Sequence, residues 1–135
     1  MSNPILVVED NEDLSILFKL VLESAGYEVA TVNNGYAALD NIAQIQPQLI
    51  LLDVMMPGIS GLEVAQDLKQ QHNYQSLPIL LVSAADRLED KQIYDSKADG
   101  IIYKPFDLDD LISRVEDLTC NHVAGIRGTH PLQKS

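Results

Sequence analysis

The stretch Leu-Ile-Leu-Leu-Asp-Val-Met-Met-Pro-Gly at residues 49–58 joins an unbroken apolar run to one carboxylate and then to a Pro-Gly turn. The apolar residues 49–52 are too few for a helix, and they do not alternate with polar residues. A run of this kind is typical of a strand that is buried on both faces of a parallel sheet. We therefore expect a central strand here, with Asp53 just beyond its carboxyl end.

Similar short runs recur along the chain. Residues 5–8 and 79–82 are continuously aliphatic, and residues 101–102 form a weaker pair. Residues 27–32 are more polar, which favours a strand at an edge of the sheet. Together with the central run, these segments predict five strands.

Helical spacing fills the intervals between the predicted strands. Apolar residues recur at positions i, i+3, i+4 and i+7 in the clearest of these intervals, and two others have a weaker helical pattern. The predicted helices are 14–22 ending near Gly26, 36–45, one that Ser60 opens, 87–97, and 108–118 with Asp107 as its N-cap.

The sequence Ser-Gly-Leu-Glu at residues 60–63 has the form of a capping box, which marks the start of a helix. The inner face of that helix is expected to consist of Leu62, Ala65 and Leu68. Strand and helix alternate five times along the chain. This order predicts an α/β fold, a doubly wound five-stranded parallel sheet with five helices on its two faces and right-handed crossovers.

Length and composition limit the class of protein. A chain of 135 residues suits one domain, and an apolar content of 46% argues against a disordered chain. The helical pattern stops after Leu118, so we expect a domain at residues 1–118 and a mobile tail or linker stub at 119–135. Cys120 is the only cysteine, so no intramolecular disulfide can form.

The charge of the chain argues against several kinds of partner. Nine Lys and Arg against 20 Asp and Glu give a net charge of −11, which repels phosphate backbones and anionic membranes. No apolar run approaches the roughly 18 residues of a membrane span. Residues 1–4 also lack the pattern of a secretory signal. These features predict a cytoplasmic protein that does not bind nucleic acid or membranes directly.

Polar residues follow four of the predicted strands at their carboxyl ends. In chain order they are Glu9 and Asp10, then Asp53, then Ser83, and finally Lys104. All strands of a parallel sheet end at the same edge, which is where ligands bind in such sheets. We therefore expect three carboxylates, one hydroxyl and one ammonium to converge.

Three close carboxylates need a cation or a proton, because each pair repels by roughly 4 kcal/mol at an effective dielectric constant of about 20. A small set of hard oxygen ligands suits Mg²⁺ better than Zn²⁺. With Mg²⁺ bound, one carboxylate can attack a phosphoryl group whose charge the cation and Lys104 share. Ser83 is expected to donate to a phosphoryl oxygen, and the backbone N–H groups of Ala84 and Ala85 are further candidate donors.

These motifs together resemble the response-regulator receiver domain of two-component signalling, a CheY-like family. The resemblance covers about residues 4–118 and rests on Glu9-Asp10, on Asp53 in its segment 49–58, on Ser83-Ala84 and on Tyr103-Lys104-Pro105-Phe106. It implies the flavodoxin-like strand order 2-1-3-4-5. It also implies a signalling switch that promotes its own phosphorylation and dephosphorylation, and not an enzyme that acts on other substrates.

The resemblance assigns the chemistry of the acidic residues. It implies that Asp53 accepts a phosphoryl group from a phosphohistidine on a sensor histidine kinase or a histidine phosphotransfer protein. It implies that Asp10 and Asp53 bind Mg²⁺ directly. Met55 is implied to contribute its backbone carbonyl oxygen, and Glu9 to act through a water molecule.

The resemblance also assigns the residues of the switch. Lys104 is implied to pair with the phosphoryl oxygens, which Ser83 and the backbone of Ala84 also bind. Tyr103 is implied to turn inward into the space that Ser83 leaves. The Lys104-Pro105 bond is implied to be cis, an isomer found in about 5–6% of X-Pro bonds. The face formed by the fourth helix, fifth strand and fifth helix then changes for a downstream effector protein or domain.

Several positions depart from the usual pattern of the family. Glu9 stands where many members have Asp, and Ser83 stands where Thr is commoner. Lys97 stands where a glycine is usual, and Gly100 where an acid is usual. We therefore expect the turn before the last strand to be built differently. Asp110 and Arg114 match a branch of the family that dimerises through its last helices, but Gly100 does not. A monomer and a phosphorylation-dependent homodimer both stay open.

Two other functions fit parts of the pattern. A metal-dependent phosphohydrolase would use Asp53 as its nucleophile, but Met55 stands where such an enzyme would want a second acid. A pseudo-receiver that acts as a scaffold would lack a member of the polar set, and every member is present. Both alternatives are therefore weaker than the phosphoryl-dependent switch.

Overall fold

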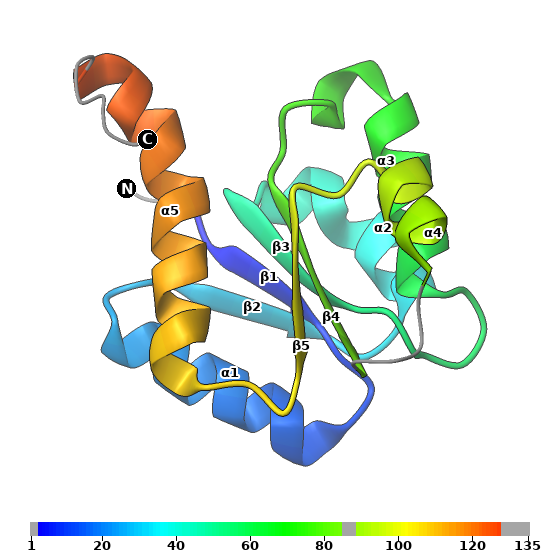
Figure 1. The fold of residues 1–135 in the computed structure, drawn as a ribbon, viewed down its shortest axis with the longest axis horizontal. Helices are drawn as coiled ribbons and strands as arrows, with labels where there is room; N and C mark the ends of the chain where they lie inside the picture. The colour runs from blue at the N-terminus through cyan, green and yellow to red at the C-terminus, as the bar shows by residue number, and fades with distance from the viewer. Residues whose placement is uncertain (1–2, 85–88, 128–135) are drawn as a thin grey trace.

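The computed structural model describes residues 3–84 and 89–127 of the chain, with side chains as far as Thr119. Its elements in chain order are β1 (Ile5–Val8), α1 (Glu12–Ser24), β2 (Val29–Val32), α2 (Gly35–Ile45), β3 (Leu49–Asp53), α3 (Gly61–Gln70), the short 3₁₀ helix η1 (His72–Tyr74), β4 (Ile79–Ala84), α4 (Asp90–Ser96), β5 (Gly100–Lys104) and α5 (Leu108–Arg127). Strands and helices alternate as the sequence predicts, and η1 is an addition to the predicted set (Figure 1). Within this part of the chain, no helix is long and apolar enough to cross a bilayer.

The five strands are parallel and lie in the order β2-β1-β3-β4-β5. The predicted doubly wound, flavodoxin-like sheet is therefore confirmed. Residues 27–32 do supply an edge strand, although the strand itself begins at Val29. β1 and β3 are buried along their whole length, because each has a strand on both sides and helices on both faces. The unbroken apolar runs of the sequence correspond to these covered strands.

The sheet separates two apolar cores, because successive residues of a strand point to opposite faces. Phe18 of α1 and Val115 of α5 belong to the core on one face. Ile42 of α2 and Leu68 of α3 belong to the core on the other face. Figure 1 shows α1 and α5 on one side of the sheet and α2, α3 and α4 on the opposite side.

Polar side chains cap the first turns of the helices, and at the start of α5 the cap is Asp107, as predicted. The side-chain oxygens of Asn11 and Asn34 accept backbone N–H groups at the starts of α1 and α2. At the start of α3, Ser60 and Glu63 form both hydrogen bonds of the predicted capping box. Each cap satisfies an N–H group that has no partner within the helix.

The inner face of α3 differs in part from the prediction. Ala65 and Leu68 are buried as expected, but Leu62 is only partly buried and Val64 is fully buried. The buried stripe starts at Gly61 and continues at i+3, i+4 and i+7. The missing side chain of Gly61 lets this turn approach β3, which rotates Val64 rather than Leu62 toward the sheet.

The last helix is longer than predicted. Apolar spacing ends at Leu118, but α5 continues to Arg127, so the predicted end of this helix is wrong. The buried Thr119 donates its hydroxyl to the carbonyl of Val115 at 2.9 Å and lies 3.0 Å from the Tyr27 hydroxyl. A polar residue is thus packed without breaking the helix. The helix crosses the predicted domain boundary, and residues 128–135 of the predicted tail lie outside the described residues.

The turn before β5 is built on a lysine in the left-handed region. α4 spans Asp90–Ser96, and the predicted helix start at 87–88 lies outside the described residues. Lys97 then adopts φ 63°, where a glycine is commoner. Asp99 exchanges hydrogen bonds with both backbone groups of Ile79, which fixes the entry to β5 beside β4.

Gly61 lies against the end of β3, where a β-carbon would overlap the backbone of Asp53. Backbone atoms cannot move aside easily, so we expect Gly61→Ala to lower the free energy of unfolding by about 2–3 kcal/mol. Gly26→Ala is the control, because its β-carbon meets open space and adds only left-handed backbone strain of about 1 kcal/mol. Urea denaturation measures both, and equal losses in the two variants would contradict the close packing at Gly61.

Candidate metal and phosphoryl-acceptor site

The carboxyl edge of the sheet gathers the charged residues that the sequence singles out. β1 leads into Glu9 and Asp10, β3 ends on Asp53, and β5 ends on Lys104. The parallel register of the strands brings these ends side by side. Glu9, Asp10 and Asp53 each offer one oxygen within 4.8 Å of the others. The Nζ atom of Lys104 lies 3.9 Å from Oδ1 of Asp53.

Two of the three carboxylates are almost completely buried. The exposed fraction is 2% for Glu9 and 3% for Asp53, whereas Asp10 is exposed. Oε2 of Glu9 accepts the backbone N–H of Asn11 at 3.1 Å, but Oε1 is buried without a hydrogen-bond partner. Oδ1 of Asp53 accepts the N–H of Met55 at 3.3 Å. A buried oxygen without a donor costs free energy, so Oε1 is suited to bind a cation.

Burial and repulsion raise the pKa values of both buried acids. The pKa of Glu9 rises from 4.5 to about 7, first because burial penalises the charged form and then because Asp53 is negative. Burial likewise raises the pKa of Asp53, although the ammonium of Lys104 acts in the opposite direction. Protons and a cation therefore compete for the same pocket.

The donor set fits a divalent cation such as Mg²⁺. Three carboxylates supply hard oxygen ligands, and one lysine offsets part of their charge. The unpartnered Oε1 of Glu9 lies within this group. The exposed position of Asp10 leaves one side of the group open to water, which Mg²⁺ tends to retain in its coordination shell. These residues can thus hold a metal ion.

Ser83 and Tyr103 lie opposite each other on neighbouring strands but differ in their surroundings. Ser83 is fully buried, and its hydroxyl donates to the carbonyl of Ala84 at 3.2 Å, which is long for a hydroxyl donor. The side chain of Tyr103 is 37% exposed, so it is not turned into the interior. Ala85, the second candidate backbone donor, lies outside the described residues.

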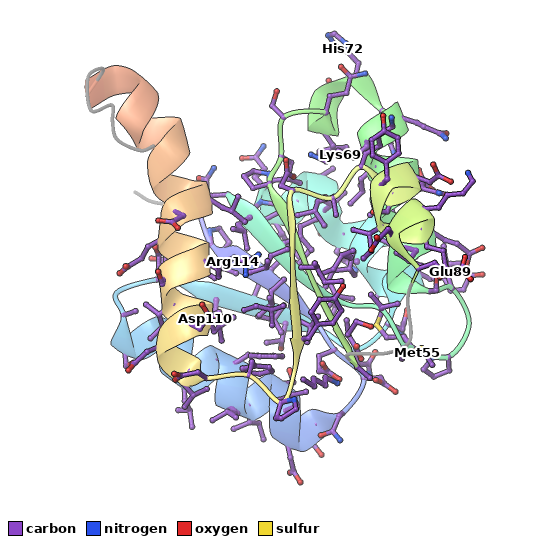
Figure 2. All side chains as sticks on the ribbon, in the orientation of Figure 1. Met55, Lys69, His72, Glu89, Asp110 and Arg114 are labelled. Atoms are coloured by element: carbon purple, nitrogen blue, oxygen red, sulfur yellow. The ribbon has the colours of Figure 1, made fainter. Side chains whose placement is uncertain are left out.

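Met55 and Pro105 follow Asp53 and Lys104 closely in the chain. The side chain of Met55 is 57% exposed, and Figure 2 shows it on the loop that follows β3. Its backbone N–H is bonded to Asp53, and the metal-binding role of its carbonyl oxygen stays a prediction. The Lys104-Pro105 peptide bond is cis, as the family resemblance implies.

Two residues that position the site were not predicted. Asn11 caps α1 with its side chain and donates its backbone N–H to Glu9, so it both starts the helix and orients the carboxylate. An Asn directly before a helical segment is an N-cap signal, and it could have identified this residue. Gly61 packs behind Asp53, and no sequence pattern indicates that contact.

Comparison with known proteins agrees with the class that this fold and site define. The family model described as response regulator receiver domain matches residues 5–116. The DNA-binding dual master transcriptional regulator RpaA of Synechocystis is 36% identical over 115 residues, which are 84% of this chain and 48% of RpaA. A putative response regulator from Chloroflexus aurantiacus has a TM-score of 0.83 and 29% identity, and the match covers 89% of this chain and 99% of that one. The regulator TrrA of Thermotoga maritima, solved in complex with Mg²⁺-BeF, has a TM-score of 0.78 and 35% identity. The match covers 87% of this chain and 99% of TrrA.

The chain therefore belongs to the response regulator receiver domain family, and its role is that of a receiver in a two-component phosphorelay. The chain spans about half the length of the curated relatives it matches. These relatives do not favour the phosphohydrolase or the scaffold.

The raised pKa of Glu9 predicts how the stability of the metal-free protein depends on pH. The folded state binds more protons than the unfolded state between pH 4.5 and about 7, so its free energy of unfolding falls as the pH rises through this window. The fall due to Glu9 should reach up to roughly 3 kcal/mol. Urea denaturation at several pH values, with chelator present, measures it in the wild type and in Glu9→Gln.

The difference in the free energy of unfolding between the wild type and Glu9→Gln separates the contribution of Glu9 from that of the other acids. Glu9→Gln removes the titrating carboxyl and should be the more stable protein near pH 7 without metal. Excess Mg²⁺ should reduce this difference, because the cation stabilises the ionised carboxylate. A pH dependence that Glu9→Gln leaves unchanged would contradict the raised pKa.

Proposed function

We propose that this chain accepts a phosphoryl group on Asp53 from a phosphohistidine of a partner protein and then acts as a conformational switch. The observation that carries this proposal is the Nζ atom of Lys104, 3.9 Å from Asp53 in an otherwise acidic pocket. An ammonium in that position can neutralise the charge that a phosphoryl group brings. Membership of the receiver family supports the same role.

The transfer step uses Asp53 as a nucleophile. One of its carboxylate oxygens attacks phosphorus, and the bond between phosphorus and the histidine nitrogen breaks. The electron pair of that bond returns to the imidazole, and Asp53 becomes an acyl phosphate. Burial raises the pKa of Asp53 and opposes its ionisation, so the opposite effect of Lys104 favours the reactive form. Attack by water on the acyl phosphate later restores the carboxylate and releases phosphate.

Mg²⁺ is the cofactor that we assign to the three carboxylates. Asp10 and Asp53 would bind it directly, Met55 through its backbone carbonyl oxygen, and Glu9 through a water molecule. When bound, the ion neutralises charge on the phosphoryl oxygens. The unpartnered oxygen of Glu9 supports a cation at this place, and TrrA, which is similar to this chain, was solved with Mg²⁺-BeF.

The switch follows from the new charge on Asp53. Ser83 and the backbone N–H of Ala84 would bind phosphoryl oxygens, and Lys104 would pair with them. Ser83 gives up only a 3.2 Å bond to a carbonyl, which a charge-assisted bond outweighs. Tyr103, which is now 37% exposed, would turn inward. These changes shift a two-state equilibrium of α4, β5 and α5.

The proposed partners are a phosphodonor and an effector. A sensor histidine kinase or histidine phosphotransfer protein would supply the phosphoryl group. A cleft of about 670 Å³ opens beside Glu9 and Asp10, and Ile16 and Leu20 are 51% and 60% exposed on α1. Ile16 lines the cleft, and these exposed apolar side chains support docking of a protein on α1. The greater length of the relatives supports a downstream effector, with this receiver as a monomer or a phosphorylation-dependent homodimer.

The charge and cysteine content complete the proposal. A net charge of −11 opposes direct binding to nucleic acid or to anionic membranes, so a separate effector would carry such contacts. A single cysteine suits the reducing conditions of the cytoplasm, which we propose as the location.

Incubation with acetyl phosphate and Mg²⁺ is expected to add one phosphoryl group, seen as a gain in intact mass. Asp53→Asn removes the nucleophile and should abolish the gain, whereas Asp117→Asn changes an exposed acid on α5 and should retain it. Multiple turnover on small phosphate esters would favour the phosphohydrolase. Absence of uptake by the unaltered chain would favour the scaffold.

Met55 controls how long the phosphoryl group persists, because its side chain cannot orient a hydrolytic water. We expect slow loss from the wild type and loss about tenfold faster in Met55→Asn, a change of about 1.4 kcal/mol in the barrier. Met55→Leu is the control, since it keeps the size of the side chain without a polar group. Intact mass is followed after acetyl phosphate is removed, and equal lifetimes in the Asn and Leu variants would refute this role.

A further inference from the structure

A hydrogen bond between a side chain and a strand ties α5 to β5. The guanidinium of Arg114 donates from Nη2 to the backbone carbonyl of Ile101 at 3.0 Å. Figure 2 shows the Arg114 side chain on the side of α5 that faces β5. Ile101 lies on the strand that ends at Lys104, so the bond joins α5 to the strand that carries the ammonium of the site.

Gly100 gives Arg114 the room to make this bond. A β-carbon at Gly100 would lie 3.3 Å from Nη2 of Arg114 and 3.2 Å from Cδ1 of Leu80. Gly100 does not have a positive φ, so the backbone conformation itself does not require glycine. Its missing side chain instead leaves space for the guanidinium. We call Arg114, Gly100 and the Ile101 carbonyl the α5 clamp.

Because β5 is an edge strand, the clamp can fix the position of α5 along it. β5 is an edge strand of the sheet, and every second carbonyl of an edge strand faces away from the neighbouring strand. The clamp gives such a carbonyl a charged donor. Leu111 and Val115 also hold α5 on the sheet, but apolar contacts have no preferred direction. The guanidinium bond makes α5 follow β5 rather than slide over it.

We propose that the α5 clamp is the link through which a change at Asp53 reaches α5, with Arg114 as a positioning residue. This inference rests on the function proposed above. A phosphoryl group on Asp53 draws Lys104 closer than its present 3.9 Å, and β5 moves with Lys104. The Ile101 carbonyl then carries Arg114 and α5 along. A partner that binds α5 thereby responds to the state of Asp53.

Hydrogen–deuterium exchange of the full chain tests the clamp, with and without Mg²⁺ and beryllofluoride as the phosphoryl mimic. In the wild type, the mimic should change exchange in both β5 and α5. Arg114→Met removes the donor and keeps an apolar stem, so it should retain the change in β5 and lose about half or more of the change in α5. In Gly100→Ala the new β-carbon lies 3.3 Å from Nη2 of Arg114, so the guanidinium must shift by a few tenths of an ångström and the loss in α5 should be smaller. The double variant should lose no more than Arg114→Met, because both changes act on the same bond.

Two further variants sharpen the test. Arg114→Lys keeps a charged donor and should recover part of the α5 response. Asp117→Asn changes an exposed acid on α5 outside the clamp and should respond as the wild type does. A full α5 response in Arg114→Met, with β5 responding, would overturn the clamp alone. A wild type that shows no change in β5 would overturn the proposed function and the clamp with it.

Discussion

The structure depends on one topological constraint, which is that the strands of a parallel sheet all have their carboxyl ends at the same edge. β1 and β3 are neighbours, so Glu9 and Asp53 meet at that edge with Asp10 beside them. Their mutual repulsion opposes folding in the absence of a cation, and burial of Glu9 and Asp53 makes it worse. The fold tolerates this cost because two apolar cores hold the strands in place on both faces. The ammonium of Lys104 offsets only part of the charge.

The same constraint explains why the site can respond to a single chemical event. A group of carboxylates that is short of positive charge could hold a divalent cation, which would offset the negative charge of a phosphoryl group. Moving a two-state equilibrium from 1:99 to 99:1 requires about 5.5 kcal/mol. Two or three charge-assisted hydrogen bonds, at roughly 1.5–3 kcal/mol each, supply that amount. Ser83 and Lys104 already lie at the strand ends where such bonds would form.

Patterns that depend on residues adjacent in the chain could be predicted from the sequence, and patterns set by contacts between distant segments could not. The unbroken run 49–52 identified a covered strand, and Ser60 with Glu63 identified a helix start. The packing of Thr119 within α5 could not be predicted, because its hydroxyl contacts that of Tyr27, which is 92 residues away in the chain. The burial of Val64 in place of Leu62 likewise depends on how closely Gly61 approaches β3.

The candidate site follows the same rule. Convergence of Glu9, Asp53 and Lys104 could be inferred because it requires only the strand assignments and parallel pairing. The route by which a change at this site reaches the helices could not be inferred, because it depends on contacts between side chains of one element and the backbone of another. In the sequence, Gly100 is recognised only as the absence of an acid. In the fold, the guanidinium of Arg114 lies next to Gly100 and bonds to the carbonyl of Ile101. A substitution that removes one interaction can thus create another, and only the packing of α5 on β5 reveals which interaction replaces it.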